Sequence, residues 1–214
     1  MYLQRFIDLE KTGRPVRIGL VGLGAMGLGM AYNICNTPGM RLLHVGDKNP
    51  AALEELKKVV PGLAAKEYAG ERCHEIPTQS DIDIFMEASS SVPDGYTYSK
   101  AALAAGKHLI LMNGEVDCFY GTELYELAKA RGVIFSSTDG DQYGVLIKLI
   151  EEAELMRLRP IMIGNVKGYL DTEANPTSIK AAADERNLDY EMCVTYTDGT
   201  KLAIEMAIMS NATG

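Results

Sequence analysis

Short apolar runs alternate with longer amphipathic stretches along most of the chain. The runs, each expected to form a buried strand, cover residues 17–21, 40–45, 82–88, 107–112 and 133–137. The stretches between them, expected to form helices, cover residues 28–36, 51–60, 93–105, 121–131 and 141–156. Strands that alternate with helices in this way predict an α/β fold with a doubly wound, mostly parallel sheet and right-handed crossovers.

The pattern is different at both ends of the chain and in one internal stretch. Residues 1–16 mix charged and apolar positions and favour a leading helix, and residues 63–80 have no clear period. After Arg159 we expect a strand at 160–166, a polar segment, a helix at 177–186 and a last helix that begins near Thr200. This change predicts a new region of the protein from residue 159 onward.

A glycine motif lies directly after the first predicted strand. Gly22, Gly24 and Gly27 have the spacing Gly-x-Gly-x-x-Gly, and a helix is predicted to follow at once. In a dinucleotide-binding turn, the first glycine permits the tight turn, the second lets the backbone approach a pyrophosphate, and the third lets helix and strand pack closely. Asp47, at the end of the second strand, lies 20 residues beyond Gly27 and is placed to accept hydrogen bonds from ribose hydroxyls. The motif alone is weak, but this context predicts a Rossmann fold that binds NAD or NADP.

The candidate cofactor-binding residues follow the first four strands of the chain. They are Gly22, Leu23, Gly24, Ala25, Met26, Gly27, Asp47, Lys48, Ala88, Ser89, Ser90 and Asn113. Lys48 complicates the choice between NAD and NADP, because a cation beside Asp47 favours a 2′-phosphate. The preference therefore stays open. The domain prediction is a lead-in at 1–16, an NAD(P)-binding domain at 17–158, and the start of a truncated, mainly helical substrate-binding or dimerisation region at 159–214.

Acidic residues gather on the two loops predicted after the fourth and fifth strands. The candidates for binding substrate or a metal are Glu115, Asp117, Asp139, Asp141 and Gln142. Carboxylates at helix starts stabilise the helix dipole, which would explain one or two of them. The alternatives are a polyhydroxylated substrate or a divalent metal that bridges substrate oxygens.

Lysines of the last region are the candidate catalytic groups. Lys201 and Glu205 are four residues apart and share one face of the last predicted helix, where a surface ion pair is the ordinary explanation. Alternatively, Lys201 donates a proton or a hydrogen bond to a carbonyl that receives hydride, and Asp198 orients the substrate. Lys167 is the second lysine candidate. His44 and His108 lie in predicted strands and are expected to pack rather than to catalyse.

The composition of the chain limits the classes of molecule that we expect it to bind. The 214 residues carry a formal charge of −8 and are 47% hydrophobic, which argues for a folded core and against nucleic acid or an anionic membrane as a partner. The four scattered cysteines lack metal-ligand spacing and predict reduced thiols in a cytoplasmic protein. A small-molecule substrate is the expected partner.

Five segments of the chain resemble segments of related oxidoreductase families. The segment 101–113 resembles the AL-x-x-GKH stretch of homoserine dehydrogenases and of sugar oxidoreductases related to glucose–fructose oxidoreductase. The motifs at 112–117, 139–142, 198–201 and 211–214 resemble the homoserine-dehydrogenase-like branch of deoxyxylulose-phosphate reductoisomerase-like proteins, which carry a C-terminal SAF domain. The chain departs from homoserine dehydrogenases at Gly114, where they have lysine, and it lacks the Glu-Lys-Pro motif of the sugar oxidoreductases.

The resemblance implies an NAD(P)-dependent oxidoreductase that acts on a small hydroxylated or phosphorylated carbonyl compound. In that branch an isomerisation precedes hydride delivery, and the full-length protein is expected to form a homo-oligomer, a dimer. The segment 169–173 departs from the branch, in which an asparagine-rich segment is found at this place. The competing interpretation is a non-catalytic Rossmann module that senses NAD(P).

Overall fold

The computed structural model describes residues 2–138, 142–186 and 188–213. The chain divides into two compact units, Met1–Ser136 and Ser137–Gly214. Within the described residues no helix is long and apolar enough to cross a bilayer.

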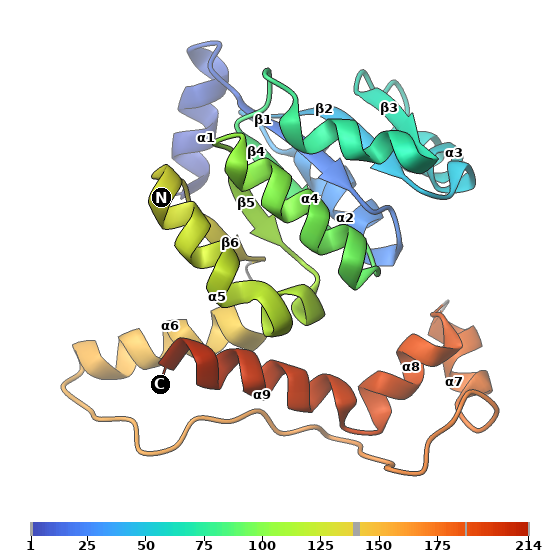
Figure 1. The fold of residues 1–214 in the computed structure, drawn as a ribbon, viewed down its shortest axis with the longest axis vertical. Coiled ribbons are helices and arrows are strands. Elements are labelled where there is room, and N and C mark those ends of the chain that lie inside the picture. Colours follow the sequence, from blue (N-terminus) through green and yellow to red (C-terminus); the bar gives the residue numbers. More distant parts are fainter. Residues whose placement is uncertain (1, 139–141, 187, 214) are drawn as a thin grey trace. The chain divides into compact units, whose positions relative to one another are not determined.

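Six strands form a single sheet in the order β3-β2-β1-β4-β5-β6 (Figure 1). The strands are β1 (Val16–Val21), β2 (Met40–Asp47), β3 (Lys66–Ala69), β4 (Ile84–Glu87), β5 (His108–Leu111) and β6 (Phe135–Ser137). The pairs β1–β2, β1–β4, β2–β3 and β4–β5 are parallel. The chain thus winds outward in both directions from β1, which confirms the predicted doubly wound sheet.

Helices cover both faces of this sheet. The first unit contains the helices α1 (Tyr2–Lys11), α2 (Ala25–Asn36), α3 (Pro50–Val59), η1 (Gly70–Thr78, a 3₁₀ helix), α4 (Val92–Ala104) and α5 (Gly114–Arg131). One core cluster, which includes Leu20, Ile34 and Leu56, joins the sheet to α2 and α3. A second cluster, which includes Phe85 and Leu124, joins it to η1, α4 and α5.

Local signals explain several of these boundaries. Asn49 caps α3, because its side chain accepts a hydrogen bond from the N–H of Ala51 and Pro50 occupies the first helical position. The cap and the helix agree with the sequence prediction to within one residue. Glu10, near the end of α1, accepts a hydrogen bond from the N–H of Gly39 and thereby ties the leading helix to the start of β2.

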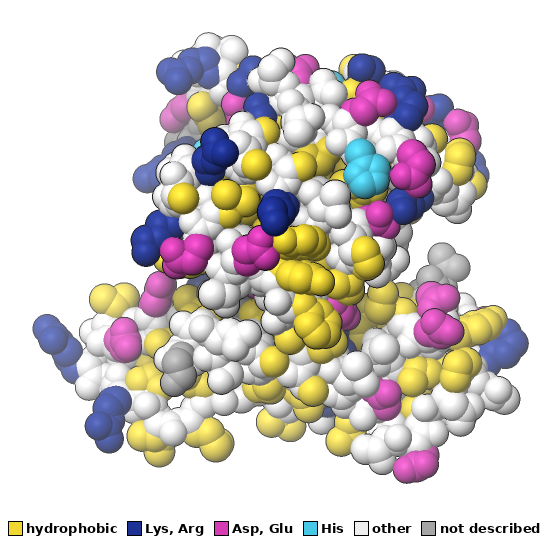
Figure 2. Space-filling model, in the orientation of Figure 1, with side chains coloured by type: hydrophobic (Ala, Val, Ile, Leu, Met, Phe, Trp, Pro, Cys, Tyr) yellow, Lys and Arg dark blue, Asp and Glu magenta, His cyan; other side chains and the backbone are white. Residues whose placement is uncertain are grey.

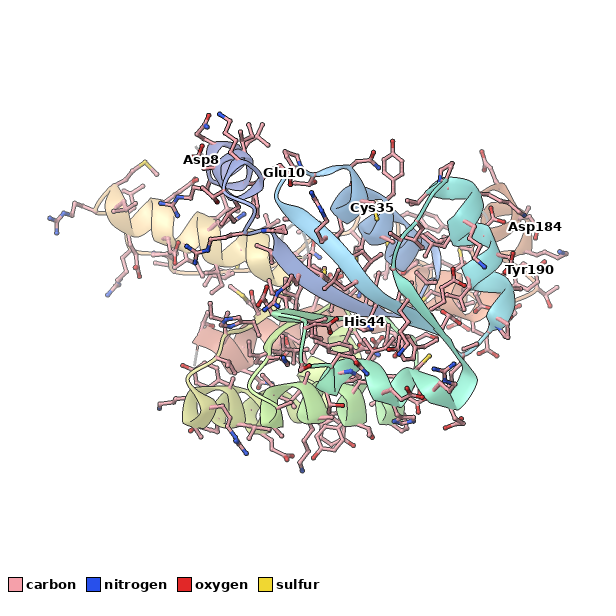
Figure 3. The ribbon with its side chains drawn as sticks, turned by 90° about the horizontal axis from the view of Figure 1, so that it is seen from above. Asp8, Glu10, Cys35, His44, Asp184 and Tyr190 are labelled. Atoms are coloured by element: carbon pink, nitrogen blue, oxygen red, sulfur yellow. The ribbon has the colours of Figure 1, made fainter. Side chains whose placement is uncertain are left out.

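Both strand histidines are packed, as expected. His44 is buried between the sheet and the layer that η1 and α4 form (Figure 3), with its ring nitrogens 2.9 Å from the Tyr68 hydroxyl and 2.7 Å from an Asp81 carboxylate oxygen. The Nδ1 atom of His108 accepts a hydrogen bond from the N–H of Ile134. Both rings are therefore occupied by structural contacts.

Two parts of the first unit were predicted wrongly. The unpatterned stretch 63–80 contains β3 and η1, because the edge strand is only four residues long and a 3₁₀ helix lacks the period of an α-helix. Helix α5 begins at Gly114 rather than at Gly121. The residues predicted to form a loop after β5 are therefore the first turn of that helix.

The second unit is mainly helical. Its helices are α6 (Gln142–Leu155), α7 (Lys180–Arg186), α8 (Tyr190–Thr197) and α9 (Thr200–Thr213). In Figure 3 the labelled residues Asp184 and Tyr190 come from α7 and α8, and the Tyr190 hydroxyl donates a 2.8 Å hydrogen bond to Asp184. The helix near Thr200 was predicted, whereas α8 was missed.

The strand predicted at 160–166 does not form. The segment is extended but irregular, and Ile161, Met162 and Val166 are each about nine-tenths exposed. A strand needs a neighbour to receive its backbone hydrogen bonds, and within the described residues this segment has no strand partner. An apolar run alone was therefore a misleading signal.

Candidate functional site

The glycine turn between β1 and α2 has the geometry that the motif predicted. Gly22 has a φ of 97°, and a Cβ atom there would overlap the carbonyl group of Ala88. A Cβ atom at Gly27 would overlap the carbonyl oxygen of Gly22. These two positions therefore require glycine for the backbone turn and for close helix–strand packing.

Gly24 differs from its two neighbours in the motif. Its φ of −63° suits any residue, and a Cβ atom there would have nothing within 4 Å. The space beside it is open, and Gly24, Ala25 and Met26 are all exposed. Helix α2 begins here without a side-chain cap, so its first backbone N–H groups can bind an anion. This open, uncapped helix start fits a pyrophosphate.

Asp47, at the end of β2, holds the glycine turn in place. One of its carboxylate oxygens accepts a 2.7 Å hydrogen bond from the N–H of Leu23, and the other accepts a 2.7 Å bond from the N–H of Asn49. The N–H of Gly22 donates to the carbonyl of Gly46, which joins the same two chain segments. The candidate ribose-binding carboxylate is thus fixed against the turn.

Lys48 is exposed, but its ammonium group already has acidic partners. Its Nζ atom lies 2.8 Å from an Asp94 carboxylate oxygen and 4.0 Å from one of Glu71. The hydrogen bond to Asp94 is the main reason that the pKa of Lys48 is raised, so the side chain stays charged. The carboxylates of Asp94 and Glu71 therefore balance much of the positive charge of Lys48. On the face of the first unit seen in Figure 2, basic and acidic side chains are interspersed in the same way.

The loop after β4 is held through the peptide groups of Ser89. The N–H of Ser89 donates to Glu87, and its carbonyl accepts a 3.0 Å hydrogen bond from the Nδ2 atom of Asn113. Asn113 also caps α5, since its side-chain oxygen accepts from the N–H of Val116. Asn113 therefore links two neighbouring strand ends, whereas Ser90 is exposed.

Glu87 is a residue that the sequence reasoning missed. It is fully buried at the end of β4, and burial raises its pKa to about 7. Its Oε2 atom has no hydrogen-bond partner in the described part of the chain. The available signal was a carboxylate near the end of a strand predicted to be buried, to which the sequence analysis gave no role.

The acidic candidates are only partly described. Glu115 and Asp117 lie in the first turn of α5, and Gln142 is the first residue of α6. Asp139 and Asp141 lie outside the described residues. Elsewhere, among the residues that the structure describes, no three or more His, Cys, Asp or Glu side chains form a group that could hold a metal ion. For Glu115 and Asp117, a position in the first turn of a helix is the setting in which a carboxylate stabilises the helix dipole.

In the second unit, Glu205 pairs with Lys167 and not with Lys201. The Oε2 atom of the buried Glu205 accepts a 3.1 Å hydrogen bond from Lys167 and a 2.6 Å bond from Asn165. The side chain of Lys201 forms no hydrogen bond or ion pair with another described residue. The surface ion pair considered for Lys201 and Glu205 is therefore wrong.

Asp198 connects the last two helices. It directly follows α8, and its Oδ1 atom accepts a 2.8 Å hydrogen bond from the N–H of Thr200, where α9 begins. This bond fixes the turn just before Lys201.

Comparison with known proteins finds similarity to oxidoreductases. Residues 140–214 match the family model described as "Oxidoreductase DRL, catalytic domain". The chain is 26% identical over 160 residues to a homoserine dehydrogenase of Bacillus subtilis, which covers 72% of this chain and 37% of that protein. It is 29% identical over 119 residues to a homoserine dehydrogenase of Synechocystis sp., covering 55% and 28% of the two chains. The chain thus spans less than two-fifths of these relatives.

Solved structures share the fold. A scyllo-inositol dehydrogenase from Lactobacillus casei, solved with NAD(H) and scyllo-inositol, has a TM-score of 0.51 at 23% identity and covers 65% of this chain and 42% of its own. A biliverdin reductase from Synechocystis sp., solved with biliverdin and NADP⁺, has a TM-score of 0.53 at 20% identity, with 64% and 42% covered. The chain therefore has the Rossmann fold of these NAD(P)-binding oxidoreductases, and its last 75 residues match the catalytic domain of oxidoreductase DRL.

Proposed function

We propose that the chain binds a nicotinamide dinucleotide at the glycine turn and belongs to an NAD(P)-dependent oxidoreductase. The observation that carries this proposal is that two features lie together at the carboxyl ends of β1 and β2, an open helix start and a fixed carboxylate. Gly24 leaves open space beside an uncapped helix start, and Asp47 is fixed next to it by the N–H of Leu23. A diphosphate fits the first of these features and a ribose the second.

The substrate in this proposal is a small hydroxylated or phosphorylated carbonyl compound. The similarity to homoserine dehydrogenases and to the DRL catalytic domain supports a carbonyl substrate, and an isomerisation before reduction is the finer form of the hypothesis. The bound cofactor supplies the hydride. The chain's own groups orient the substrate and stabilise charge on the carbonyl oxygen.

Lys201 is our choice for the group that polarises the carbonyl. Lys167 already donates to the buried Glu205, whereas Lys201 has no such partner among the described residues. A lysine that is not held by a carboxylate can direct its proton to a substrate oxygen. Asp198, through its bond to Thr200, fixes the turn that presents Lys201. Glu115, Asp117, Asp139, Asp141 and Gln142 remain candidates for holding substrate hydroxyls.

Cofactor binding is tested by titrating the chain with NADH and with NADPH and following nicotinamide fluorescence. We expect saturable binding of at least one cofactor and competition by its oxidised form. No saturable binding of either would overturn the proposed function.

Catalysis is tested with Lys201→Met and with Lys180→Met as the matched control, because Lys180 pairs with Asp184 on the exposed face of α7. On a panel of sugar phosphates and hydroxy-aldehydes, we expect Lys201→Met to keep cofactor binding and to lose turnover about a hundredfold or more. Lys180→Met should keep both. Cofactor binding without turnover on any panel member in the unmodified chain would favour the nucleotide sensor instead.

The proposed assembly is a homodimer, as the resemblance implies. Light scattering of the purified chain at several concentrations measures its mass, and a monomer at every concentration would remove this part of the proposal for the chain.

A further inference from the structure

The peptide bond between Ala88 and Ser89 is central to the first unit's candidate site. On one side it packs directly against Gly22, because a Cβ atom at Gly22 would overlap the Ala88 carbonyl and crowd the Ser89 nitrogen. On the other side, the N–H of Ser89 donates a 2.8 Å hydrogen bond to the Oε1 atom of Glu87. The carbonyl of Ser89 accepts from Asn113. Movement of this peptide would therefore alter the glycine turn.

Glu87 places a buried carboxyl group directly next to the Ala88–Ser89 peptide bond. Its side chain is fully buried, and its Oε2 atom lacks a hydrogen-bond partner among the described residues. Helix α4 closes over it at Gly95, where even a Cβ atom would lie 3.1 Å from the Glu87 carboxyl group. A carboxylate in such a place loses its hydration without full compensation, whereas the neutral acid tolerates burial.

We propose that Glu87 is a positioning residue whose protonation couples the Ala88–Ser89 peptide, and with it cofactor affinity, to pH. This inference rests on the proposed function, because it needs a cofactor at the glycine turn. The protonated side chain keeps Oε1 as the acceptor for Ser89. Ionisation places a negative charge behind the peptide that lines the diphosphate site, and this charge repels the diphosphate.

The surrounding charges favour the neutral form. Burial is the largest cause of the raised pKa of about 7, and the negative charge of Asp94 adds to it, while the hydrogen bond from the N–H of Ser89 acts in the opposite direction. The titratable and charged groups that interact electrostatically with Glu87 or with its neighbours Cys73, Asp94 and Tyr98 include Asp47 at the end of β2, Lys48 directly after it, and Glu71 and His74 of η1.

Two groups near Glu87, Cys73 and Tyr98, titrate above the range from pH 6 to pH 9 that the experiment below covers. Burial raises the pKa of Cys73 to about 11, and burial also raises the pKa of Tyr98. The His74 ring packs edge-on against Tyr98 with its centroid 4.8 Å away. Histidine is the side chain that most often changes charge near neutral pH, so His74 needs its own control.

The experiment measures the dissociation constant of the cofactor from pH 6 to pH 9 for the unmodified chain, Glu87→Gln and His74→Gln. Linkage predicts that the affinity of the unmodified chain falls about three- to tenfold across this range, as expected if the bound cofactor raises the pKa of Glu87 by about half a unit to one unit. Glu87→Gln keeps a neutral side chain and an acceptor for Ser89, so its affinity should stay near the low-pH value. His74→Gln should keep the pH dependence.

A second measurement covers the case in which Glu87→Gln does not fold. Calorimetric titration of the unmodified chain at pH 7, in two buffers of different ionisation enthalpy, should show proton uptake on cofactor binding. Binding without proton uptake, or an unchanged pH profile in Glu87→Gln, overturns the role of Glu87 and leaves cofactor binding standing. Absence of binding even at pH 6 overturns the proposed function as well.

Discussion

The carboxylate of Asp47 accepts a hydrogen bond from the backbone N–H of Leu23, so the end of β2 holds the turn that follows β1. The two residues are 24 positions apart, and the bond joins the two parts of the proposed site that we expect to contact different portions of a dinucleotide. The Asp47 carboxylate is therefore expected to contribute both to the stability of the fold and to the proposed ligand binding.

Asp47→Ala should weaken both the stability of the fold and the binding of the cofactor. It removes two hydrogen bonds to a charged acceptor, and we expect a loss of about 2 kcal/mol in the free energy of unfolding measured by urea titration. Cofactor affinity should fall about tenfold or more. Asp189→Ala is the control, because Asp189 caps α8 through the N–H of Met192 in the other unit. Equal cofactor affinity in Asp47→Ala and the unmodified chain would contradict the assignment.

Two glycines of the motif should respond in opposite ways to alanine. Gly27→Ala pushes a Cβ atom into the carbonyl oxygen of Gly22, so we expect a loss of about 3 kcal/mol or more in stability. Gly24→Ala meets no atom within 4 Å and should unfold at nearly the same temperature as the unmodified chain. Its cofactor affinity should nevertheless fall, since the methyl group would occupy the space that we propose for the diphosphate. Thermal unfolding and fluorescence titration distinguish the two effects, and intact binding in Gly24→Ala would count against that site.

Asp94→Asn should shift the preference between the two cofactors. The change removes the carboxylate that holds Lys48 at 2.8 Å and leaves the ammonium group free to pair with a 2′-phosphate. We expect the ratio of NADPH to NADH affinity to rise about three- to tenfold, a modest change because the pair is exposed. Asp184→Asn, which releases Lys180 in the second unit, should leave the ratio unchanged. A falling ratio in Asp94→Asn would show that Lys48 does not face the adenosine ribose.

Glu87→Gln should alter how stability depends on pH. The pKa of Glu87 is about 7 in the folded chain, above its ordinary value of 4.5. Its favourable contribution is therefore fully present below about pH 4.5 and is lost as pH rises through 7. The stability of Glu87→Gln relative to the unmodified chain should grow across this window by at most about 3 kcal/mol. Urea unfolding at intervals of pH measures the difference, and two parallel stability curves would refute a raised pKa.

The two candidate lysines should differ in their effect on stability. Lys167→Met leaves Glu205 buried with one donor fewer, which should cost about 1 to 3 kcal/mol in unfolding free energy. Lys201→Met removes no described ion pair and should change stability by less than about 0.5 kcal/mol. Urea unfolding of both variants checks this contrast. A larger cost for Lys201→Met would indicate a structural role for Lys201.

The sequence was most informative where the signal is local. The Gly22–Gly27 motif and the Asn49–Pro50 helix start are each contained within a few residues, and both have the predicted conformation. The start of α5 was missed because Asn113 and Gly114 are typical of loops as well as of helix starts. Local patterns thus identify elements better than their boundaries.

Contacts between distant residues could not be predicted from the pattern. Nothing local indicates that Asp94 holds Lys48, 46 positions away, or that Lys167 reaches Glu205, 38 positions away. The 3₁₀ helix η1 contains Pro77 and lacks the period of an α-helix, so the packing of its Cys73 and Ile76 in one core cluster with Tyr68 could not be predicted either. Such features depend on the assembled sheet.

The order of the strands has a consequence for how the site can arise. The turn after β1 borders segments that lie on opposite sides of it in the sheet, Gly46 at the end of β2 and Ala88 after β4. A nascent chain that stops before β4 can form the turn, but it lacks the Ala88–Ser89 segment against which Gly22 packs in the folded protein. If the proposed cofactor site is correct, capture of the cofactor during synthesis should begin only after residue 113 has left the ribosome, since Asn113 donates a hydrogen bond to the carbonyl of Ser89 in this segment.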